Sequence, residues 1–404
     1  TGSLRGDINW YKNEEGTGSF TLAISVAKTS LDSTCMTMAD LNDDGSMDLL
    51  NTSLGNHGVH WYPNLDGNGD YRYQHRAPNF IPYFNPMATF PLDIDNDNDI
   101  DLITSTLHGI YISENTDGYG DFEPLEEIYN NFSDGVLDMH VIDLDADGDQ
   151  DIIFANDSGE VLWMENTDGL GNFNTASIII YLFTSIELIL PFDMNGDNLI
   201  DIALIDNTSS YKLKVLENNG DATFTVTDVS NEIGEPGDLI SGDINNDGTV
   251  DLLASGNNVG GNVIWWLNQG NSGEFNEGVQ LSNSYGASDR NIALALIDGD
   301  NLLDLVYQRN TNNNIRWAKN TGNGFTDSES FLLSDITTGT TGIIAEDVDG
   351  DTDVDIIVSF GFSTAGYIRW CENGRIILDN EVSDPPKDQR VQIFPNPSDN
   401  ILNI

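Results

Sequence analysis

Short aspartate-rich segments recur along this 404-residue sequence, and one of them, residues 143–151, reads DLDADGDQD. Carboxylates at alternate positions converge if the backbone curls, and the glycine at the sixth position permits the sharp turn. Carboxylates held this closely repel one another unless a cation lies among them. Six to eight oxygen ligands at flexible geometry suit Ca²⁺ better than Mg²⁺. The segment therefore predicts a calcium-binding loop.

The acidic segment occurs seven times at a regular spacing. The copies are DLNDDGSMD from Asp40, DIDNDNDID from Asp93, DLDADGDQD from Asp143, DMNGDNLID from Asp193, DINNDGTVD from Asp243, LIDGDNLLD from Leu296 and DVDGDTDVD from Asp347. Their starts are 53, 50, 50, 50, 53 and 51 residues apart. Self-similarity at a fixed period indicates a repeat architecture.

A second motif alternates with the acidic segment and ends in asparagine, as in VHWYPN, VLWMEN and IRWAKN. Each period reads as four short strands: an apolar run before the acidic loop, a second run after it, the asparagine-ended strand, and, after a Gly-rich turn, a strand that opens at Phe173 in the third copy. This pattern predicts an all-β fold, a seven-bladed β-propeller with four-stranded antiparallel blades and calcium-binding loops. An open β-solenoid and a fragment of an eight-bladed propeller are the alternatives.

The two ends of the sequence bear on closure of such a ring. Residues 1–30 begin in mid-repeat, so the N-terminal strands are predicted to complete the blade whose inner strands come from residues 341–371. Cys35 and Cys371 are the two cysteines. In a closed ring they fall in neighbouring blades, and a disulfide between them is one hypothesis, with two free thiols as the other.

The charge balance excludes two classes of partner. The chain has 67 acidic and 15 basic residues and a formal net charge of −52. Nucleic acids and anionic membrane surfaces attract Lys and Arg, so neither is an expected partner. The most apolar stretch, residues 177–192, is shorter than the about 20 residues that a spanning helix needs and contains Glu187, so no transmembrane segment is predicted.

The acidic loops resemble those of FG-GAP or VCBS repeats, the family that includes the integrin α-chain propeller. The resemblance implies a calcium-loaded propeller with about six Ca²⁺ sites. Carried over loop by loop, the implied ligands are Asp40, Asn42, Asp44 and Asp48; Asp93, Asp95, Asp97 and Asp101; Asp143, Asp145, Asp147 and Asp151; Asp193, Asn195, Asp197 and Asp201; Asp243, Asn245, Asp247 and Asp251; and Asp347, Asp349, Asp351 and Asp355. The sixth loop departs from the pattern, because Leu296 replaces the first carboxylate and only Asp298, Asp300 and Asp304 remain.

The last residues, VQIFPNPSDNILNI, resemble the start of the C-terminal sorting domain that the type IX secretion system of Bacteroidetes uses. We therefore divide the chain into a propeller over 1–378, a linker over 379–390 and a truncated sorting domain over 391–404. The resemblance implies an extracellular or outer cell-surface location.

Function is less specified than fold. Six of the seven tryptophans share one repeat position, which is more typical of packing between blades than of sugar-stacking platforms. No HExxH or GxSxG motif is present. We expect a monomeric secreted or cell-surface module that binds a glycan or an extracellular protein, for example in adhesion; a polysaccharide lyase or hydrolase on a propeller scaffold is the alternative.

Overall fold

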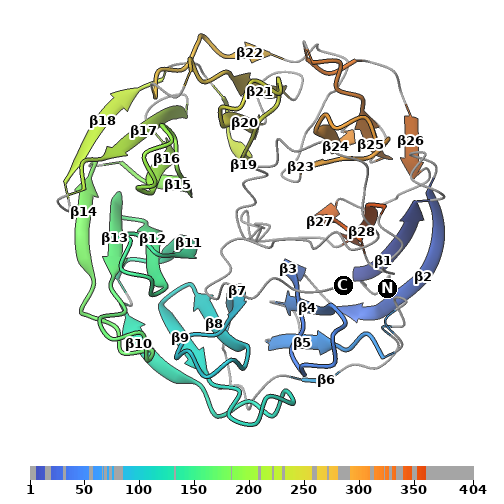
Figure 1. Cartoon of the computed structure of the whole chain (residues 1–404). Coiled ribbons are helices and arrows are strands. Elements are labelled where there is room, and N and C mark those ends of the chain that lie inside the picture. Colours follow the sequence, from blue (N-terminus) through green and yellow to red (C-terminus); the bar gives the residue numbers. More distant parts are fainter. Residues whose placement is uncertain are drawn as a thin grey trace.

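The computed structural model places the chain in an all-β propeller (Figure 1). It describes residues 6–13, 20–30, 33–53, 58–65, 67, 71, 75–76, 85–131, 133–182, 184–207, 211–220, 223–229, 233–256, 262–270, 273–280, 292–309, 314–322, 324–326, 330–333, 340–347 and 353–360. Within these residues the strands form seven four-stranded antiparallel sheets.

Six of these sheets are blades built from four consecutive strands. They are β3(Ser33–Ala39), β4(Asp48–Ser53), β5(Gly58–Tyr62) and β6(His75–Arg76); β7(Pro86–Leu92), β8(Asp101–Thr106), β9(Gly109–Ser113) and β10(Glu126–Asn130); β11(Val136–Ile142), β12(Asp151–Asn156), β13(Glu160–Met164) and β14(Ser177–Tyr181); β15(Ile186–Phe192), β16(Asp201–Asp206), β17(Lys212–Asn218) and β18(Phe224–Asp228); β19(Pro236–Gly242), β20(Asp251–Gly256), β21(Asn262–Trp266) and β22(Val279–Gln280); and β23(Ile292–Ala295), β24(Asp304–Arg309), β25(Asn314–Ala318) and β26(Ser330–Leu333). We number these blades one to six in chain order.

The remaining sheet combines strands from both ends of the described chain. Its order is β2-β1-β28-β27, with β1(Gly6–Asn13) and β2(Phe20–Ser30) joined to β27(Thr340–Glu346) and β28(Asp355–Phe360). The pairing of β1 with β28 is antiparallel and places Trp10 opposite Ile357. The two ends therefore share one sheet, as the closure interpretation predicts.

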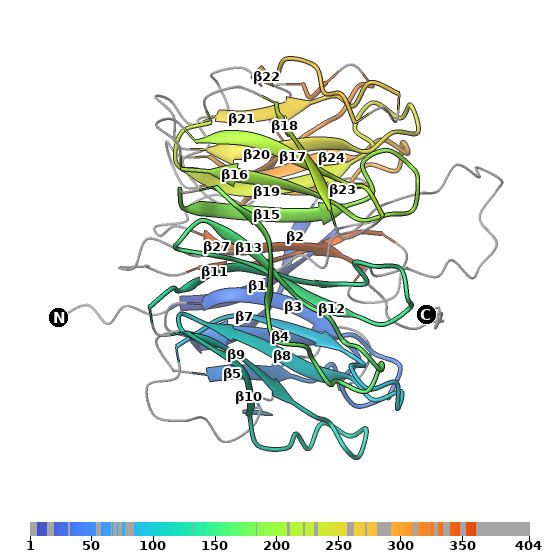
Figure 2. The same cartoon turned by 90° about the vertical axis from the view of Figure 1, so that its left-hand side faces the viewer.

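In each of the six blades the first strand lies nearest the centre of the ring, and in the remaining sheet β27 takes this place (Figure 1). Contacts run from β3 to β7, β11, β15, β19, β23 and β27 in turn, and β27 contacts β3. In the side view the strands run across the thickness of the molecule, so the loops that join them emerge at its two faces (Figure 2).

The core lies between neighbouring blades. The second strands are flanked on both faces, and every residue of β12 is buried. One apolar cluster joins Phe90 and Ile103 of the second blade to Met139 and Phe154 of the third. The outer strands are more open, with the pattern exposed, exposed, half-buried, half-buried, exposed along β14. The described part of the apolar stretch 177–192 forms β14 and β15, and among the described residues no helix meets the length and hydropathy of a membrane span.

The fourth strand starts later than the sequence indicates. In the third blade, Phe173 forms an isolated bridge with Asn166, and the strand begins at Ser177. The backbone N–H of Asn174 donates to the carbonyl oxygen of Glu165, and this bond closes the Gly-rich hairpin before the outer strand begins. The aromatic residue thus belongs to the hairpin rather than to the strand.

Candidate metal-binding loops

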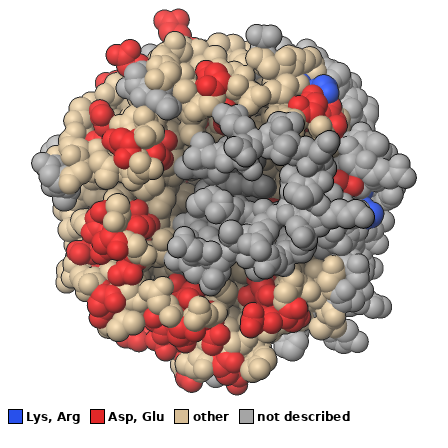
Figure 3. Space-filling view, viewed as in Figure 1, with Lys and Arg blue, Asp and Glu red and all other residues tan. Residues whose placement is uncertain are grey.

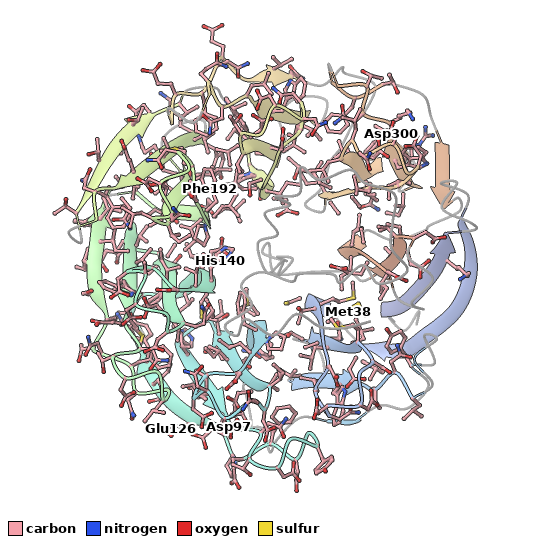
Figure 4. All side chains as sticks on the ribbon, in the orientation of Figure 1. Met38, Asp97, Glu126, His140, Phe192 and Asp300 are labelled. Carbon is pink, nitrogen blue, oxygen red and sulfur yellow. The ribbon has the colours of Figure 1, made fainter. Side chains whose placement is uncertain are left out.

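Each acidic loop joins the innermost strand of a sheet, which we call its first strand, to the second strand beside it. The last aspartate of the segment is the first residue of the second strand: Asp48 of β4, Asp101 of β8, Asp151 of β12, Asp201 of β16, Asp251 of β20, Asp304 of β24 and Asp355 of β28. Repetition of this geometry places equivalent carboxylates at the same end of every described blade. Figure 4 shows Asp97 and Asp300 in such loops at well separated places around the ring, whereas His140 points from β11 toward the centre.

The loop of the third blade shows how the backbone curls. The two carboxylate oxygens of Asp143 accept hydrogen bonds from the backbone N–H groups of Asp147 at 3.2 Å and Gly148 at 3.0 Å. Asp145 Oδ1 also accepts from Asp147 N at 3.2 Å. Asp147 Oδ1 accepts from Asp149 N at 3.0 Å. The aspartates at positions one, three and five of the segment thus wrap the backbone around a common point.

The sixth position of the segment needs a left-handed backbone, as the glycine there indicates. Gly45 has φ of 87°, Gly148 has 103° and Gly248 has 85°. Asparagine, the residue other than glycine that best tolerates this region, takes the position in three other loops, where Asn98 has φ of 76°, Asn198 has 67° and Asn301 has 63°.

The last aspartate of the segment is buried and tightly held. Asp151 Oδ1 accepts from the backbone N–H of Asn166 at 2.8 Å, and Oδ2 accepts from Leu144 N at 3.2 Å. Burial raises the pKa of this carboxyl to about 7, although these N–H donors lower it in part. Burial likewise raises the pKa to about 7 for Asp48, Asp101, Asp251 and Asp304, and to about 6 for Asp201. A buried carboxylate of this kind is stabilised in its charged form by a nearby cation.

Two loops bring three of their four predicted ligands within reach of one ion, and Asp97 and Asp147 lie outside these two groups. Carboxylate oxygens lie within 4.8 Å of one another for Asp93, Asp95 and Asp101, and for Asp143, Asp145 and Asp151. A further group joins Asp145 and Asp147 to Glu165. Glu165 is not among the ligands that the sequence predicts. Its position directly before the repeated asparagine was the available signal, because Glu114 takes the same place in the second blade.

Three loops carry asparagine where these two carry the second aspartate. In the fourth blade the amide nitrogen of Asn195 donates to Asp197 Oδ2 at 3.0 Å, and in the fifth Asn245 donates to Asp247 Oδ2 at 2.8 Å. In these loops the amide N–H group of the asparagine therefore occupies a carboxylate oxygen that could otherwise bind a cation. Asn42 holds the equivalent position in the first blade.

The last two acidic segments differ from the others. In the sixth blade Lys319 forms ion pairs with Asp298 and Asp300. Of the predicted ligands near the C-terminal end, Asp347 and Asp355 flank the loop between β27 and β28, whereas Asp349 and Asp351 lie outside the described residues.

The repeated asparagine has a role that local sequence did not reveal. Its side-chain amide donates to a backbone carbonyl of the preceding blade, at the second position of that blade's acidic loop. The pairs are Asn115 with Leu41 at 3.1 Å, Asn166 with Ile94 at 3.2 Å, Asn218 with Leu144 at 3.4 Å, Asn268 with Met194 at 2.6 Å and Asn320 with Ile244 at 2.7 Å. These bonds tie the acidic loops of the first five blades to the blade that follows each of them.

The repeated tryptophan packs between blades, as predicted. Trp61 is 6% exposed, and its ring meets Phe122 of the second blade edge-on with centroids 6.5 Å apart. Its indole N–H also donates to Asp48 Oδ2 at 2.9 Å. Trp265 packs against Phe325 of the sixth blade, with the two rings tilted by 55° and their centroids 6.0 Å apart. Buried rings of this kind cannot stack on a sugar, so these two are not sugar-binding platforms.

Two other predicted features fall partly outside the described residues. Cys35 is buried in β3 and disulfide-bonded, and Cys371, the other cysteine of the sequence, lies beyond them. The whole of the proposed linker and sorting segment, residues 379–404, also lies beyond them.

The acidic residues gather in separate patches around one face of the ring rather than in a single belt (Figure 3). This distribution matches an arrangement in which each blade contributes its own acidic loop. The face carries few lysine or arginine side chains among the described residues (Figure 3).

Comparison with known proteins supports the repeat assignment. An FG-GAP-like repeat model matches residues 193–254 and 297–358, so the chain contains FG-GAP-like repeats. Each matched range contains two consecutive acidic segments, apart from Leu296 at the start of the sixth, with an asparagine-ended strand between them. No curated protein sequence matches the chain.

Solved structures with a similar fold include two lectins. An Agrocybe aegerita lectin that recognises non-reducing terminal N-acetylglucosamine has a TM-score of 0.55 and 20% identity, over 82% of this chain and 90% of that one. The BP39L lectin from Burkholderia pseudomallei has a TM-score of 0.55 and 13% identity, over 77% of this chain and 89% of that one. BBS1N, in complex with ARL6DN, has a TM-score of 0.55 and 13% identity, over 83% and 94%. At these identities the likeness shows the fold.

Proposed function

We propose that this protein is a secreted or cell-surface binding module, a closed seven-bladed propeller that Ca²⁺ stabilises and that binds a glycan. The two-ended sheet serves as the seventh blade in this proposal. The observation that supports it is the acidic loop, which recurs at the same end of the blades and in two of them holds three carboxylates within 4.8 Å of one another.

The donor set of the loops fits calcium. All predicted ligand atoms are oxygens, which hard cations prefer. Hydrogen bonds to backbone N–H groups use one lone pair of a carboxylate oxygen and leave the other for a metal ion. In the third blade the residues that would hold the ion are Asp143, Asp145, Asp147 and Asp151, with Glu165 beside them. Calcium there would neutralise the carboxylates and hold the first and second strands together.

A glycan is the proposed ligand because lectins are among the proteins that share this fold. The strong negative charge of −52 disfavours an acidic polysaccharide and favours a neutral one. The propeller is proposed to act as a monomer. We also propose an extracellular location, on the basis of the resemblance of residues 391–404 to a type IX sorting segment.

A glycan array read in millimolar Ca²⁺ and again in EDTA tests the ligand. The expected result is binding to a set of neutral glycans in Ca²⁺, with loss in EDTA because the propeller loses its loop structure. A polysaccharide-depolymerisation assay run on the glycans that bind provides the second readout. Release of oligosaccharides would replace the binding module with an enzyme, and an array without any binding glycan would leave a protein ligand as the remaining class.

A further inference from the structure

The acidic loop of the sixth blade contains a positive charge supplied by the chain itself. Lys319 follows β25 directly, and its ammonium group contacts Asp298 Oδ2 and lies 2.8 Å from Asp300 Oδ2. The Asp298 side chain is only 16% exposed, so solvent screens this pair less than it would a surface pair. These two aspartates stand at positions three and five of the segment, where the other loops present their predicted metal ligands.

The position of Lys319 within the repeat makes the contact informative. Lys319 directly precedes the repeated asparagine, here Asn320. In the third blade the same place holds Glu165, whose carboxylate groups with Asp145 and Asp147. One repeat position therefore faces the acidic loop in both blades, and it carries a negative charge in one blade and a positive charge in the other.

A second change accompanies the lysine. Leu296 replaces the aspartate that begins the other acidic segments, and its side chain is 36% exposed. In the third blade that first aspartate accepts two backbone N–H bonds and belongs to the carboxylate group. The sixth loop has thus lost one carboxylate and gained one ammonium group, which makes its formal charge two units more positive than that of a loop with aspartate and a neutral residue at these positions.

We propose that Lys319 is a tethered cation that replaces a divalent metal ion in the sixth blade, so that this blade keeps its loop folded without calcium. The ammonium group bridges the two carboxylates that would otherwise repel each other. It also excludes a second cation, because a divalent ion at the same carboxylates would lie next to a fixed positive charge. The comparison with calcium-binding loops in the other blades rests on the proposed function. The stabilisation of the sixth loop by Lys319 does not depend on it.

Thermal melting in EDTA tests whether Lys319 stabilises the sixth loop, because EDTA removes any metal ion from the other loops. Lys319→Met keeps the aliphatic stem and removes the charge, and it should lower the melting temperature by at least about 2 °C in EDTA and by the same amount in Ca²⁺. Lys212→Met, at an exposed lysine of β17, is the matched control and should leave it unchanged. Equal melting temperatures for Lys319→Met and the unmodified chain in EDTA would overturn the proposal.

Counting bound calcium tests the exclusion of metal. Asp298→Asn with Asp300→Asn should leave the number of bound Ca²⁺ ions per chain unchanged, whereas Leu296→Asp with Lys319→Glu should raise it by one. Loss of one ion in the first variant would show that the native sixth loop binds calcium and would refute the proposal. A native chain that binds no calcium at all would refute the proposed function instead, and the melting comparison in EDTA would still decide the role of Lys319.

Discussion

The side-chain amide of Asn268 donates a 2.6 Å hydrogen bond to the carbonyl oxygen of Met194, in the acidic loop of the neighbouring blade. The same amide reaches the carbonyl oxygen of Val250 at 3.1 Å, and the backbone N–H of Asn268 binds Asp251 Oδ1 at 2.8 Å. Asn268 is 2% exposed, so water does not replace these partners. One buried side chain therefore joins the loops of two blades.

Replacement of this asparagine should destabilise the propeller. Asn268→Ala leaves the carbonyls of Met194 and Val250 without their donor, and unsatisfied buried acceptors cost about 1–3 kcal/mol. Denaturant unfolding measures the loss. Gln269→Ala, at the exposed neighbouring position, is the control and should change stability by less than about 0.5 kcal/mol. Similar losses for the two variants would mean that the bond between the blades contributes little.

Calcium should raise the stability of the whole chain. If each loop binds with an affinity of about 10⁻⁴ to 10⁻³ M, a tenfold excess of Ca²⁺ stabilises the fold by roughly 1.4 kcal/mol per site. Six independent sites would together contribute about 8 kcal/mol, comparable with the net stability of a typical domain. Melting curves in EDTA and in millimolar Ca²⁺ measure the difference. Coincident curves would identify the loops as acidic turns without metal.

The strand order was predictable because it follows from short-range patterns. The acidic segment recurs at nearly constant spacing, and Asp151 begins the strand that the sequence places after its loop. The bond from Asn268 to Met194 was not predictable, because its partners are 74 residues apart and the acceptor is a backbone atom, which leaves no trace in residue type. The contact of Lys319 with Asp298 was missed for a related reason, since the two meet only after β24 and β25 pair.

The residue at position three of the segment should set the calcium affinity of each loop. In the fourth blade Asn195 donates to Asp197, whereas Asp145 of the third blade adds a charge to its carboxylate group. Asp145→Asn should weaken that site about tenfold, and Asn195→Asp should strengthen its own site by a similar factor, because one more carboxylate within about 4 Å adds at least about 1 kcal/mol. Titration calorimetry of both variants measures the change. Affinities that move in the same direction in both would contradict the charge argument.

The Gly-rich hairpin of the second blade should tolerate no side chain at Gly120. A Cβ atom there would lie 2.4 Å from the ring of Trp61, and the residue has φ of 82°. Gly270 provides a matched control, because its φ is 67° and a Cβ would meet no atom within 4 Å. Gly270→Ala should cost about 1–2 kcal/mol from backbone strain alone, and Gly120→Ala about 1–3 kcal/mol more from the clash. Equal unfolding free energies for the two variants would show that the indole moves aside at little cost.

The inner strand β19 contains a buried carboxyl that should make stability depend on pH. Asp238 accepts from the backbone N–H of Ile292, in the next blade, at 3.3 Å and from that of Leu239 at 3.1 Å. Burial raises its pKa from 3.8 to about 8, against the effect of these two donors, and the negative charge of Asp138 adds to the rise. The folded state therefore holds a proton on Asp238 between about pH 4 and pH 8 that the unfolded state has lost.

Because the folded state binds the extra proton, the contribution of Asp238 to stability is fully present below the unfolded pKa of 3.8 and is lost progressively as the pH rises to about 8. Asp238→Asn cannot titrate, and its amide oxygen can still accept from Ile292. The melting temperature of the variant minus that of the native chain should therefore become more positive from pH 5 to pH 8, measured at one saturating Ca²⁺ concentration. Asp157→Asn, at an exposed turn, is the control for loss of one negative charge. The contrary result is a melting-temperature difference between Asp238→Asn and the native chain that stays constant from pH 5 to pH 8, or that changes with pH as the difference for Asp157→Asn does. Either outcome would show that Asp238 is already ionised in the folded state at pH 5.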